Sequence, residues 1–146
     1  MEYEFRTQRR VEFAETDMAG ILHFSNFYRY MEEAEHAFFR SLGLSVHPHG
    51  SSGELGWVRA EAACRFLQPL RYEDIVDIHV LVTEKRSKSI TYAFVFSKAG
   101  IEVARGSMAV VCITKSEGEG LRAIPMPANV DAAIQVAPTE VLDSQR

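Results

Sequence analysis

The sequence is short of cysteine, of positive charge and of long apolar runs. Its two cysteines, Cys64 and Cys112, lie singly in apolar stretches, which favours buried reduced thiols over a disulfide. Lysine and arginine number 16 against 20 acidic residues, and the formal charge of -4 disfavours binding to nucleic acid. No apolar run approaches the roughly 18 residues of a membrane-spanning helix, and residues 1–10 lack the apolar segment of a signal peptide. We therefore predict a cytoplasmic protein with neither a membrane nor a nucleic-acid partner.

The chain has the size of one domain. Its 146 residues, of which 47% are hydrophobic, suffice for a single core. We place this domain at residues 1–136 and expect residues 137–146 to form a flexible tail.

The longest helical pattern follows Asn26. Apolar residues recur there at helical spacing, with polar residues on the other face. Asn26 is the expected N-cap and Gly43 the expected residue just past the C-terminus. The apolar face comprises Phe27, Tyr30, Met31, Ala34, Phe38 and Leu42; the polar face comprises Arg29, Glu32, Glu33, Glu35, His36 and Arg40.

Alternating residues predict strands on both sides of this helix. One strand precedes it, with Tyr3, Phe5, Val11 and Phe13 on one face. Four follow, at residues 57–67, 74–84, 90–96 and 103–114, and the last is apolar on both faces, as in a central strand. In residues 57–67 the polar face carries Arg59, Glu61 and Arg65.

Turns and loops separate these strands. Residues 45–56 and 115–120 read as loops, and residues 98–100 as a hairpin turn. Residues 121–127 form a short extended return, and residues 128–134 one or two helical turns. The predicted fold is α+β, a five-stranded antiparallel sheet that covers one long central helix.

Asp17 is the candidate catalytic residue, because the predicted order of elements puts its carboxylate beside the start of the helix. A carboxylate there can attack a polarised carbonyl or activate water, while free backbone N–H groups stabilise the negative charge that develops. The alternative is that Asp17 only caps a turn.

The segment ETDMAGILHFSNFYRYMEEAE resembles the hotdog-fold thioesterases of the 4-hydroxybenzoyl-CoA thioesterase family. Asp17, the Gly20 turn, the pair His23-Phe24 and the pair Asn26-Phe27 follow the family pattern. Residues 57–74 and the ending LRAIPMP resemble two further family blocks, so the similarity covers nearly the whole chain. Many relatives have aspartate at the position of Glu15 and histidine at that of Phe24; the 4-hydroxybenzoyl-CoA branch lacks that histidine.

This resemblance implies a hotdog-fold acyl-CoA thioesterase that acts on a small aromatic or short- to medium-chain acyl group. Asp17 would be the nucleophile or general base, and the backbone N–H of Phe24 would hold the oxyanion. The resemblance gives His23 no inherited role; from its place beside the site it is an acid or base, or only a packed side chain. Related hotdog subfamilies use a strand carboxylate, so Glu61 is the reserve candidate for the catalytic carboxylate. The expected acyl pocket comprises Gly20, Asn26, Phe27 and Trp57.

The resemblance also implies the partners. Arg86 and Lys88 would hold the nucleotide end of coenzyme A, which is part of the substrate, and no other cofactor is expected. Two loop histidines, His47 and His49, have no further ligands at metal-site spacing, so we predict no metal. The family implies a homo-oligomer, either a dimer or a tetramer. The alternatives are a thioesterase for carrier-protein thioesters and a non-catalytic module that binds acyl-CoA.

Overall fold

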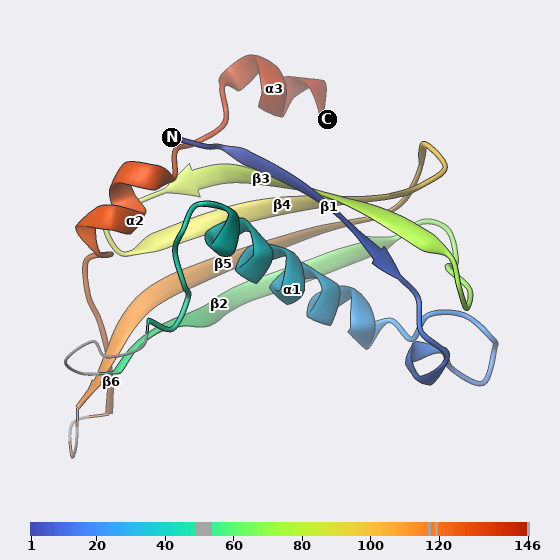
Figure 1. The fold of residues 1–146 in the computed structure, drawn as a ribbon, viewed down its shortest axis with the longest axis horizontal. Coiled ribbons are helices and arrows are strands. Elements are labelled where there is room, and N and C mark those ends of the chain that lie inside the picture. The colour runs from blue at the N-terminus through green and yellow to red at the C-terminus, as the bar shows by residue number, and fades with distance from the viewer. Residues whose placement is uncertain (49–53, 117, 119, 146) are drawn as a thin grey trace.

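A computed structural model describes residues 1–48, 54–116, 118 and 120–145. A six-stranded antiparallel sheet curves over the helix α1 (Ser25–Ser41), so the predicted α+β arrangement is confirmed (Figure 1). The strands are β1 (Glu4–Arg10), β2 (Glu54–Phe66), β3 (Ile75–Lys85), β4 (Ser89–Lys98), β5 (Ile101–Ser116) and β6 (Gly120–Ala123). Their order is β1-β3-β4-β5-β2, and β6 pairs with β5. This short strand β6 occupies the predicted extended return and raises the expected five strands to six.

Strands β3, β4 and β5 form the middle of the sheet. The predicted hairpin turn lies between β4 and β5, where Ala99 and Gly100 have φ of 50° and 80°. Such a pair of positive φ angles fits the twist of a two-residue hairpin. Strand β5 pairs with β2, β4 and β6, which confirms its predicted central position.

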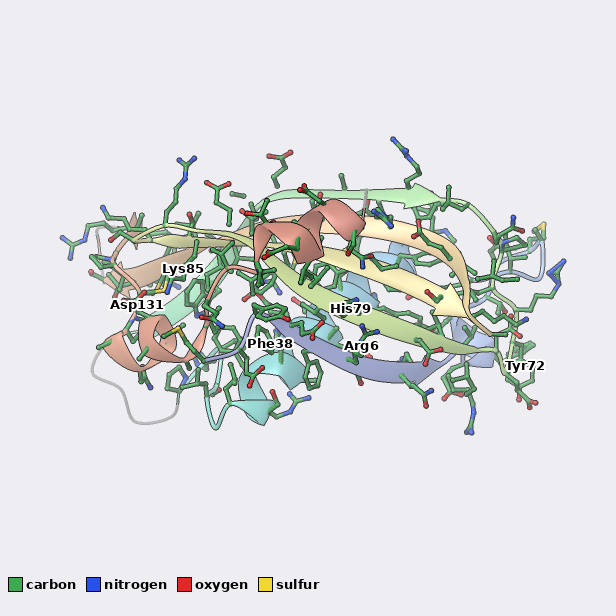
Figure 2. All side chains as sticks on the ribbon, turned by 90° about the horizontal axis from the view of Figure 1, so that it is seen from above. Arg6, Phe38, Tyr72, His79, Lys85 and Asp131 are labelled. Atoms are coloured by element: carbon green, nitrogen blue, oxygen red, sulfur yellow. The ribbon has the colours of Figure 1, made fainter. Side chains whose placement is uncertain are left out.

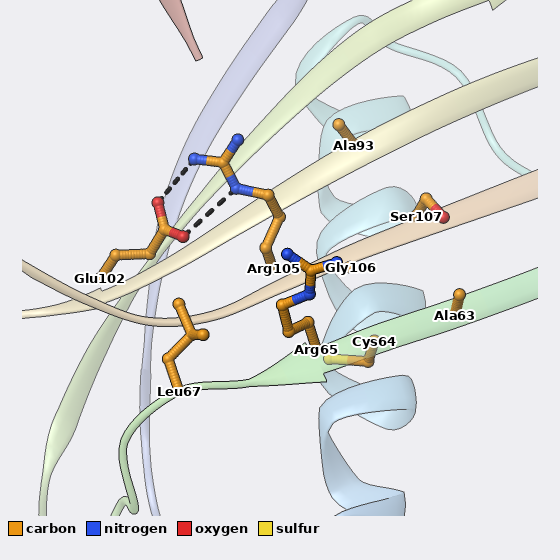
Figure 3. A pocket seen from close by; sticks show the side chains of 9 residues that line it. All are labelled: Ala63, Cys64, Arg65, Leu67, Ala93, Glu102, Arg105, Gly106 and Ser107. Atoms are coloured by element: carbon orange, nitrogen blue, oxygen red, sulfur yellow. Dashed lines mark hydrogen bonds and ion pairs between the residues drawn. The ribbon is translucent and has the colours of Figure 1, made fainter. Parts of the chain in front are cut away.

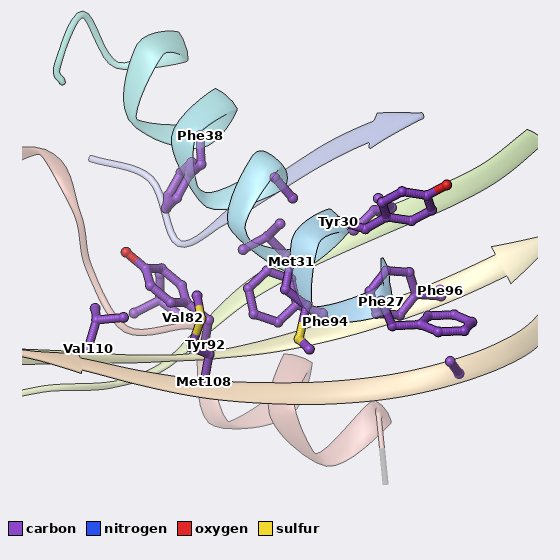
Figure 4. Packing of buried hydrophobic residues seen from close by; sticks show 14 of the residues in the cluster. Phe27, Tyr30, Met31, Phe38, Val82, Tyr92, Phe94, Phe96, Met108 and Val110 are labelled. Carbon is purple, nitrogen blue, oxygen red and sulfur yellow. The ribbon is translucent and has the colours of Figure 1, made fainter. Parts of the chain in front are cut away.

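The core lies between α1 and the inner face of the sheet (Figure 4). Every second residue of β4, from Ile90 to Phe96, is fully buried against this face. Gly106 lets α1 approach β5 closely, because a Cβ there would lie 2.5 Å from the sulfur of Met31. The helix is less simply amphipathic than predicted, since Glu35 from its expected polar face is also fully buried.

Strand β2 contains a β-bulge that reverses its faces. Its register with β5 shifts between Arg59 and Glu61, so Ala60 is an extra residue. Before the bulge Arg59 pairs with the buried Val110, whereas after it Ala62 pairs with Met108. Arg59 therefore faces α1 and Glu61 faces the outer side. The predicted placement of both residues on one face is wrong, because alternation in the sequence does not reveal a bulge.

Two predicted ends also need correction. Strand β1 stops at Arg10, because the chain leaves the ladder after Val11 exchanges backbone hydrogen bonds with Glu73 and Asp74. Phe13 belongs instead to the 3₁₀ helix η1 (Phe13–Glu15) and is 75% exposed. Asn26 is not the N-cap of α1. The helix begins at Ser25, after Phe24, and Gly43 follows its C-cap, Leu42, as predicted.

The C-terminal segment forms α2 (Ala128–Ala133) and α3 (Thr139–Ser144). Lys85 of β3 holds the first of these through an ion pair of 2.8 Å with Asp131, and both residues are labelled in Figure 2. Helix α3, inside the segment expected to be a flexible tail, lies across the sheet from α1 (Figures 1 and 2). Arg105 on that outer face donates to the carbonyl of Gln145. No helix of the described ranges is long and apolar enough to cross a membrane.

Candidate active site

Asp17 lies in a tight loop between η1 and α1. The loop closes through hydrogen bonds from the Asp17 N–H to the Ile21 carbonyl (2.8 Å) and from the Gly20 N–H to the Asp17 carbonyl (2.9 Å). Gly20 has φ of 79°, a region that favours glycine, while a Cβ there would meet nothing within 4 Å. The turn itself, and not close packing, therefore requires this glycine.

The carboxylate of Asp17 is held on one side only. Its Oδ1 accepts the N–H of Ala19 at 2.8 Å and, more weakly, that of Ile21 at 3.4 Å. Within residues 1–48, 54–116, 118 and 120–145, Oδ2 has no hydrogen bond or ion pair. The turn-capping alternative therefore describes a real role of Asp17, and it leaves one oxygen free.

The start of α1 presents a free donor beside this loop. The Asn26 N–H bonds to the His23 carbonyl at 2.9 Å, and the Ser25 N–H reaches the His23 ring at 3.3 Å. The N–H of Phe24 has no acceptor in the part of the chain that the structure describes. The first helical turn, all of it described, carries no acidic side chain, so nothing there neutralises the positive end of the helix dipole.

His23 caps the helix. Its Nδ1 lies 2.8 Å from the Ser25 hydroxyl and accepts the Ser25 N–H, which places the proton of the neutral ring on Nε2. The ring stacks on Phe24 with centroids 4.7 Å apart. These contacts match the packed, hydrogen-bonded role that was the alternative to acid or base catalysis.

A groove of about 550 Å³ joins the loop to the helix start. Phe27 and Phe66 form one wall, with ring centroids 5.3 Å apart, and Phe24 meets Phe66 at 6.3 Å. The groove therefore combines a carboxylate with aromatic walls. Its lining comprises Asp17, Ile21, Leu22, Phe24, Phe27, Phe66, Leu67, Gln68, Pro69 and Leu70.

The fold agrees with comparisons to known proteins. A model of the Thioesterase-like superfamily matches residues 11–134. The chain belongs to this superfamily. Its enzyme class is that of a thioester hydrolase.

Curated relatives of this thioesterase include two named enzymes. The present chain is 30% identical to a 1,4-dihydroxy-2-naphthoyl-CoA hydrolase of Thermosynechococcus vestitus over 94% of this chain and 93% of the relative. It is 27% identical to 4-hydroxybenzoyl-CoA thioesterase of a Pseudomonas species over 84% of this chain and 91% of the relative. Among solved structures, a 1,4-dihydroxy-2-naphthoyl-CoA thioesterase from Synechocystis gives a TM-score of 0.80 at 25% identity, covering 89% of this chain and 94% of that one. The fold is therefore the hotdog fold.

Some predicted pocket residues of this thioesterase lie outside the groove. The Asn26 side chain turns inward and donates to the Glu15 carbonyl at 2.8 Å. Trp57 packs against Phe39, in the second half of α1, with centroids 5.9 Å apart. Glu61 is exposed on the outer face of the edge strand β2, and His49 lies outside the described residues.

Arg86 and Lys88 lie far from Asp17 of the same chain. They belong to the β3–β4 turn, which is at the opposite end of the sheet from the Asp17 loop (Figure 1). Leu22 bonds to Leu70 just before β3 begins, so the 11 residues of this strand separate the two sites. At about 3.3 Å per residue, the separation is roughly 35 Å.

Two charged clusters were missed in the sequence. Glu15 accepts hydrogen bonds from Arg9 and Tyr30 beside the Asp17 loop. Arg59 of β2 forms an ion pair of 2.8 Å with Glu35, which lies in the second half of α1. Burial raises the pKa of Glu35 to about 7, although Arg59 opposes the shift. The sequence offers one weak signal for each cluster. Glu15 stands two residues before Asp17, and Arg59 stands on a predicted strand.

A second hollow lies elsewhere on the sheet. About 730 Å³ in volume, it lies along β2 and β5, with Ala63, Ala93 and Ser107 in its lining (Figure 3). Its Arg105 is already engaged by Glu102 at 2.6 Å. Neither Asp17 nor the start of α1 borders this hollow, so it lacks the chemistry found in the groove.

Proposed function

We propose that the protein hydrolyses an acyl-CoA thioester in the groove at the start of α1. The observation that carries this proposal is that one groove is lined by both Asp17 and Phe24; among the described residues, nothing bonds to one carboxylate oxygen of Asp17 or to the N–H of Phe24. These are the two groups that thioester hydrolysis requires, a base or nucleophile and an oxyanion donor.

The Phe24 N–H and the positive end of α1 would receive the thioester carbonyl oxygen. As a general base, Asp17 takes a proton from water while the water oxygen bonds to the carbonyl carbon. The tetrahedral oxyanion then collapses and expels the thiolate of coenzyme A, which takes up a proton. As a nucleophile, Asp17 itself bonds to the carbonyl carbon, the C–S bond breaks to release the thiolate of coenzyme A, which takes up a proton, and water later hydrolyses the resulting mixed anhydride.

The walls of the groove favour an aromatic acyl group over a short aliphatic one. Phe24, Phe27 and Phe66 offer ring faces and edges, and aromatic pairs add to the free energy gained by simple burial. The two named relatives act on 1,4-dihydroxy-2-naphthoyl-CoA and 4-hydroxybenzoyl-CoA, both aromatic thioesters. We therefore rank aromatic acyl-CoA first and short- to medium-chain acyl-CoA second.

Replacement of Asp17 by asparagine tests the mechanism. Asparagine keeps an oxygen for the Ala19 N–H but has no charge, so kcat should fall on the order of 10³-fold at nearly unchanged melting temperature. The substrates are acetyl-, octanoyl-, palmitoyl-, benzoyl- and phenylacetyl-CoA, with release of free thiol as the measurement. The matched control is Phe24→Leu, which keeps the backbone N–H and should lose less than about tenfold.

Three outcomes would change the assignment. Retention of more than about a tenth of kcat by Asp17→Asn would be too small a loss for a catalytic carboxylate and would make Glu61 the next residue to test. Binding of every acyl-CoA without hydrolysis would favour a non-catalytic module, and hydrolysis of carrier-protein thioesters alone would exclude the CoA ester as substrate. Single-turnover hydrolysis in ¹⁸O water separates a general base from a nucleophile whose anhydride is opened at the Asp17 carbonyl, because in that case an enzyme oxygen leaves the first product unlabelled and the label enters Asp17.

We also propose that each active site is shared between two chains. The roughly 35 Å between the Asp17 loop and the β3–β4 turn argues against one substrate molecule spanning both within one chain. The edge strand β2 supports association, because Phe66 (47%) and the following Leu67 (46%) are exposed there. In a homodimer or tetramer, Arg86 and Lys88 of one copy would bind the phosphates of a substrate held by Asp17 of another.

Mixing two variants with complementary defects, one in the catalytic carboxylate and one in CoA binding, tests this arrangement. Arg86→Ala combined with Lys88→Ala should raise KM for acyl-CoA and flatten its salt dependence while kcat changes little. Co-refolded in equal amounts with Asp17→Asn, this double variant should recover about a quarter of the parental activity at low substrate concentration, because one site in four then combines intact groups from both chains. Activity that only equals the sum of the separate variants, or a monomer in light scattering, would contradict the shared site.

A further inference from the structure

Glu15 contacts both segments that carry the proposed chemistry. It ends η1, two residues before Asp17, and its carbonyl accepts the N–H of His23 at 2.9 Å and the side-chain amide of Asn26 at 2.8 Å. The first of these bonds holds the residue directly before Phe24. One peptide group therefore connects the loop of the carboxylate to the helix start with the free N–H.

The side chain of Glu15 forms a second connection, one helical turn further on. Its Oε1 accepts the Tyr30 hydroxyl at 2.7 Å and the Glu12 N–H at 2.8 Å. Asn26 and Tyr30 are four residues apart and so share one face of α1. Both are buried, and Tyr30 is fully so. The helix is thus attached to Glu15 at two successive turns.

Arg9 completes the cluster. Its guanidinium donates to both carboxylate oxygens of Glu15, at 2.7 and 3.2 Å, and lies 4.7 Å from the centre of the Tyr30 ring. Burial alone would raise the pKa of Glu15, but the Glu12 N–H, Tyr30 and Arg9 together lower it. Glu15 is therefore ionised at neutral pH, and the Tyr30 hydroxyl remains a donor because burial and Glu15 raise its pKa.

We propose that Glu15 is a positioning residue, which fixes the distance between the Asp17 carboxylate and the Phe24 N–H. The inference rests on the proposed thioesterase mechanism. A carbonyl carbon and its oxygen are only about 1.2 Å apart. Asp17 and the Phe24 N–H must therefore approach one carbonyl group together, and a shift of about 1 Å can cost up to 10²-fold in rate. Glu15 would not touch the substrate.

Tyr30→Phe is the sharpest variant, because it removes one hydroxyl and keeps the buried ring. We expect kcat to fall about tenfold with KM changed less than about twofold. The kcat of Glu15→Ala should fall further. The kcat of Glu15→Gln should lie between that of Glu15→Ala and that of the parent, since the glutamine amide oxygen can still accept the Tyr30 hydroxyl. The matched control is Glu33→Gln, which removes the other ion pair of Arg9 (2.8 Å) and leaves Glu15 in place. Its kcat should stay within about twofold of the parent.

A double-mutant cycle separates positioning from general stabilisation. Once Asp17→Asn has removed the catalytic carboxylate, the position of the side chain at residue 17 no longer affects the rate. In that background Tyr30→Phe should lower kcat by less than about twofold. An additive cycle, or a Tyr30→Phe variant whose kcat matches that of Glu33→Gln while its melting temperature falls, would overturn the proposal. Parental hydrolysis and its loss in Asp17→Asn are measured first. Their failure would contradict the proposed function, whereas failure of the cycle alone would contradict only the role of Glu15.

Discussion

Asp17, in the loop before α1, and Glu35, in the second half of that helix, are two carboxylates with opposite surroundings. Asp17 is partly exposed, is held by two backbone amides and keeps one oxygen free. Glu35 is fully buried, and Arg59 contacts both of its oxygens, at 2.8 and 3.3 Å. An acid held from one side by neutral donors remains able to react. An acid enclosed with a cation has its bonding capacity taken up by the core.

This comparison predicts that the two regions respond to mutation in opposite ways. At the Asp17 end a change of charge should affect the rate and spare the stability. At the Glu35 end it should affect the stability first. The largest change in the free energy of unfolding should come from removing Arg59, the cation of the buried pair with Glu35. Titration of Glu35 should change it less.

Arg59→Met leaves Glu35 buried without its cation. Removing one partner of a buried ion pair costs about 3 to 5 kcal/mol, so the free energy of unfolding should fall by about 3 kcal/mol at pH 8. Urea unfolding measures this loss. The double variant Arg59→Met with Glu35→Gln should recover most of it. Arg65→Met, on the exposed side of the same strand, should cost less than about 0.5 kcal/mol. Equal losses for Arg59→Met and Arg65→Met would show that the buried pair is not what distinguishes this end.

Titration of Glu35 gives the smaller effect. Its pKa is about 7 in the folded protein against 4.5 for an unperturbed glutamate, so the folded state binds an extra proton between these two pH values. The free energy of unfolding should therefore fall as pH rises from 5 to 7, by about 2 kcal/mol from this group. Burial lowers the pKa of the neighbouring His36, which acts in the opposite direction. The measurement is thus the difference in pH dependence between the parent and Glu35→Gln, and identical slopes would rule out the buried titration.

The same comparison explains what the sequence could predict. Asp17, Gly20 and the start of α1 are neighbours along the chain, so their turn and helix signals lie in one stretch and their meeting in the fold was foreseen. Even there, Asn26 was expected to cap the helix, because nothing local indicates that its amide reaches Glu15, 11 residues earlier.

The Glu35 end could not be predicted for a related reason. Glu35 and Arg59 are 24 residues apart in the sequence, and the bulge at Ala60 decides that Arg59 faces the helix. A glutamate at a polar helix position and an arginine at a polar strand position each look like surface residues. Only the tertiary fold brings them together, because a buried charge requires a partner that local periodicity cannot specify.

The bulge in β2 also divides that strand into two halves that can evolve separately. Before Ala60, Arg59 turns toward the buried Glu35, whereas the residues after Ala60 lead to Phe66 and the groove. A shift of register in one half can be absorbed at the bulge before it reaches the other. Descendants of this chain can thus vary the wall of the substrate groove while the charged end of the core stays as it is.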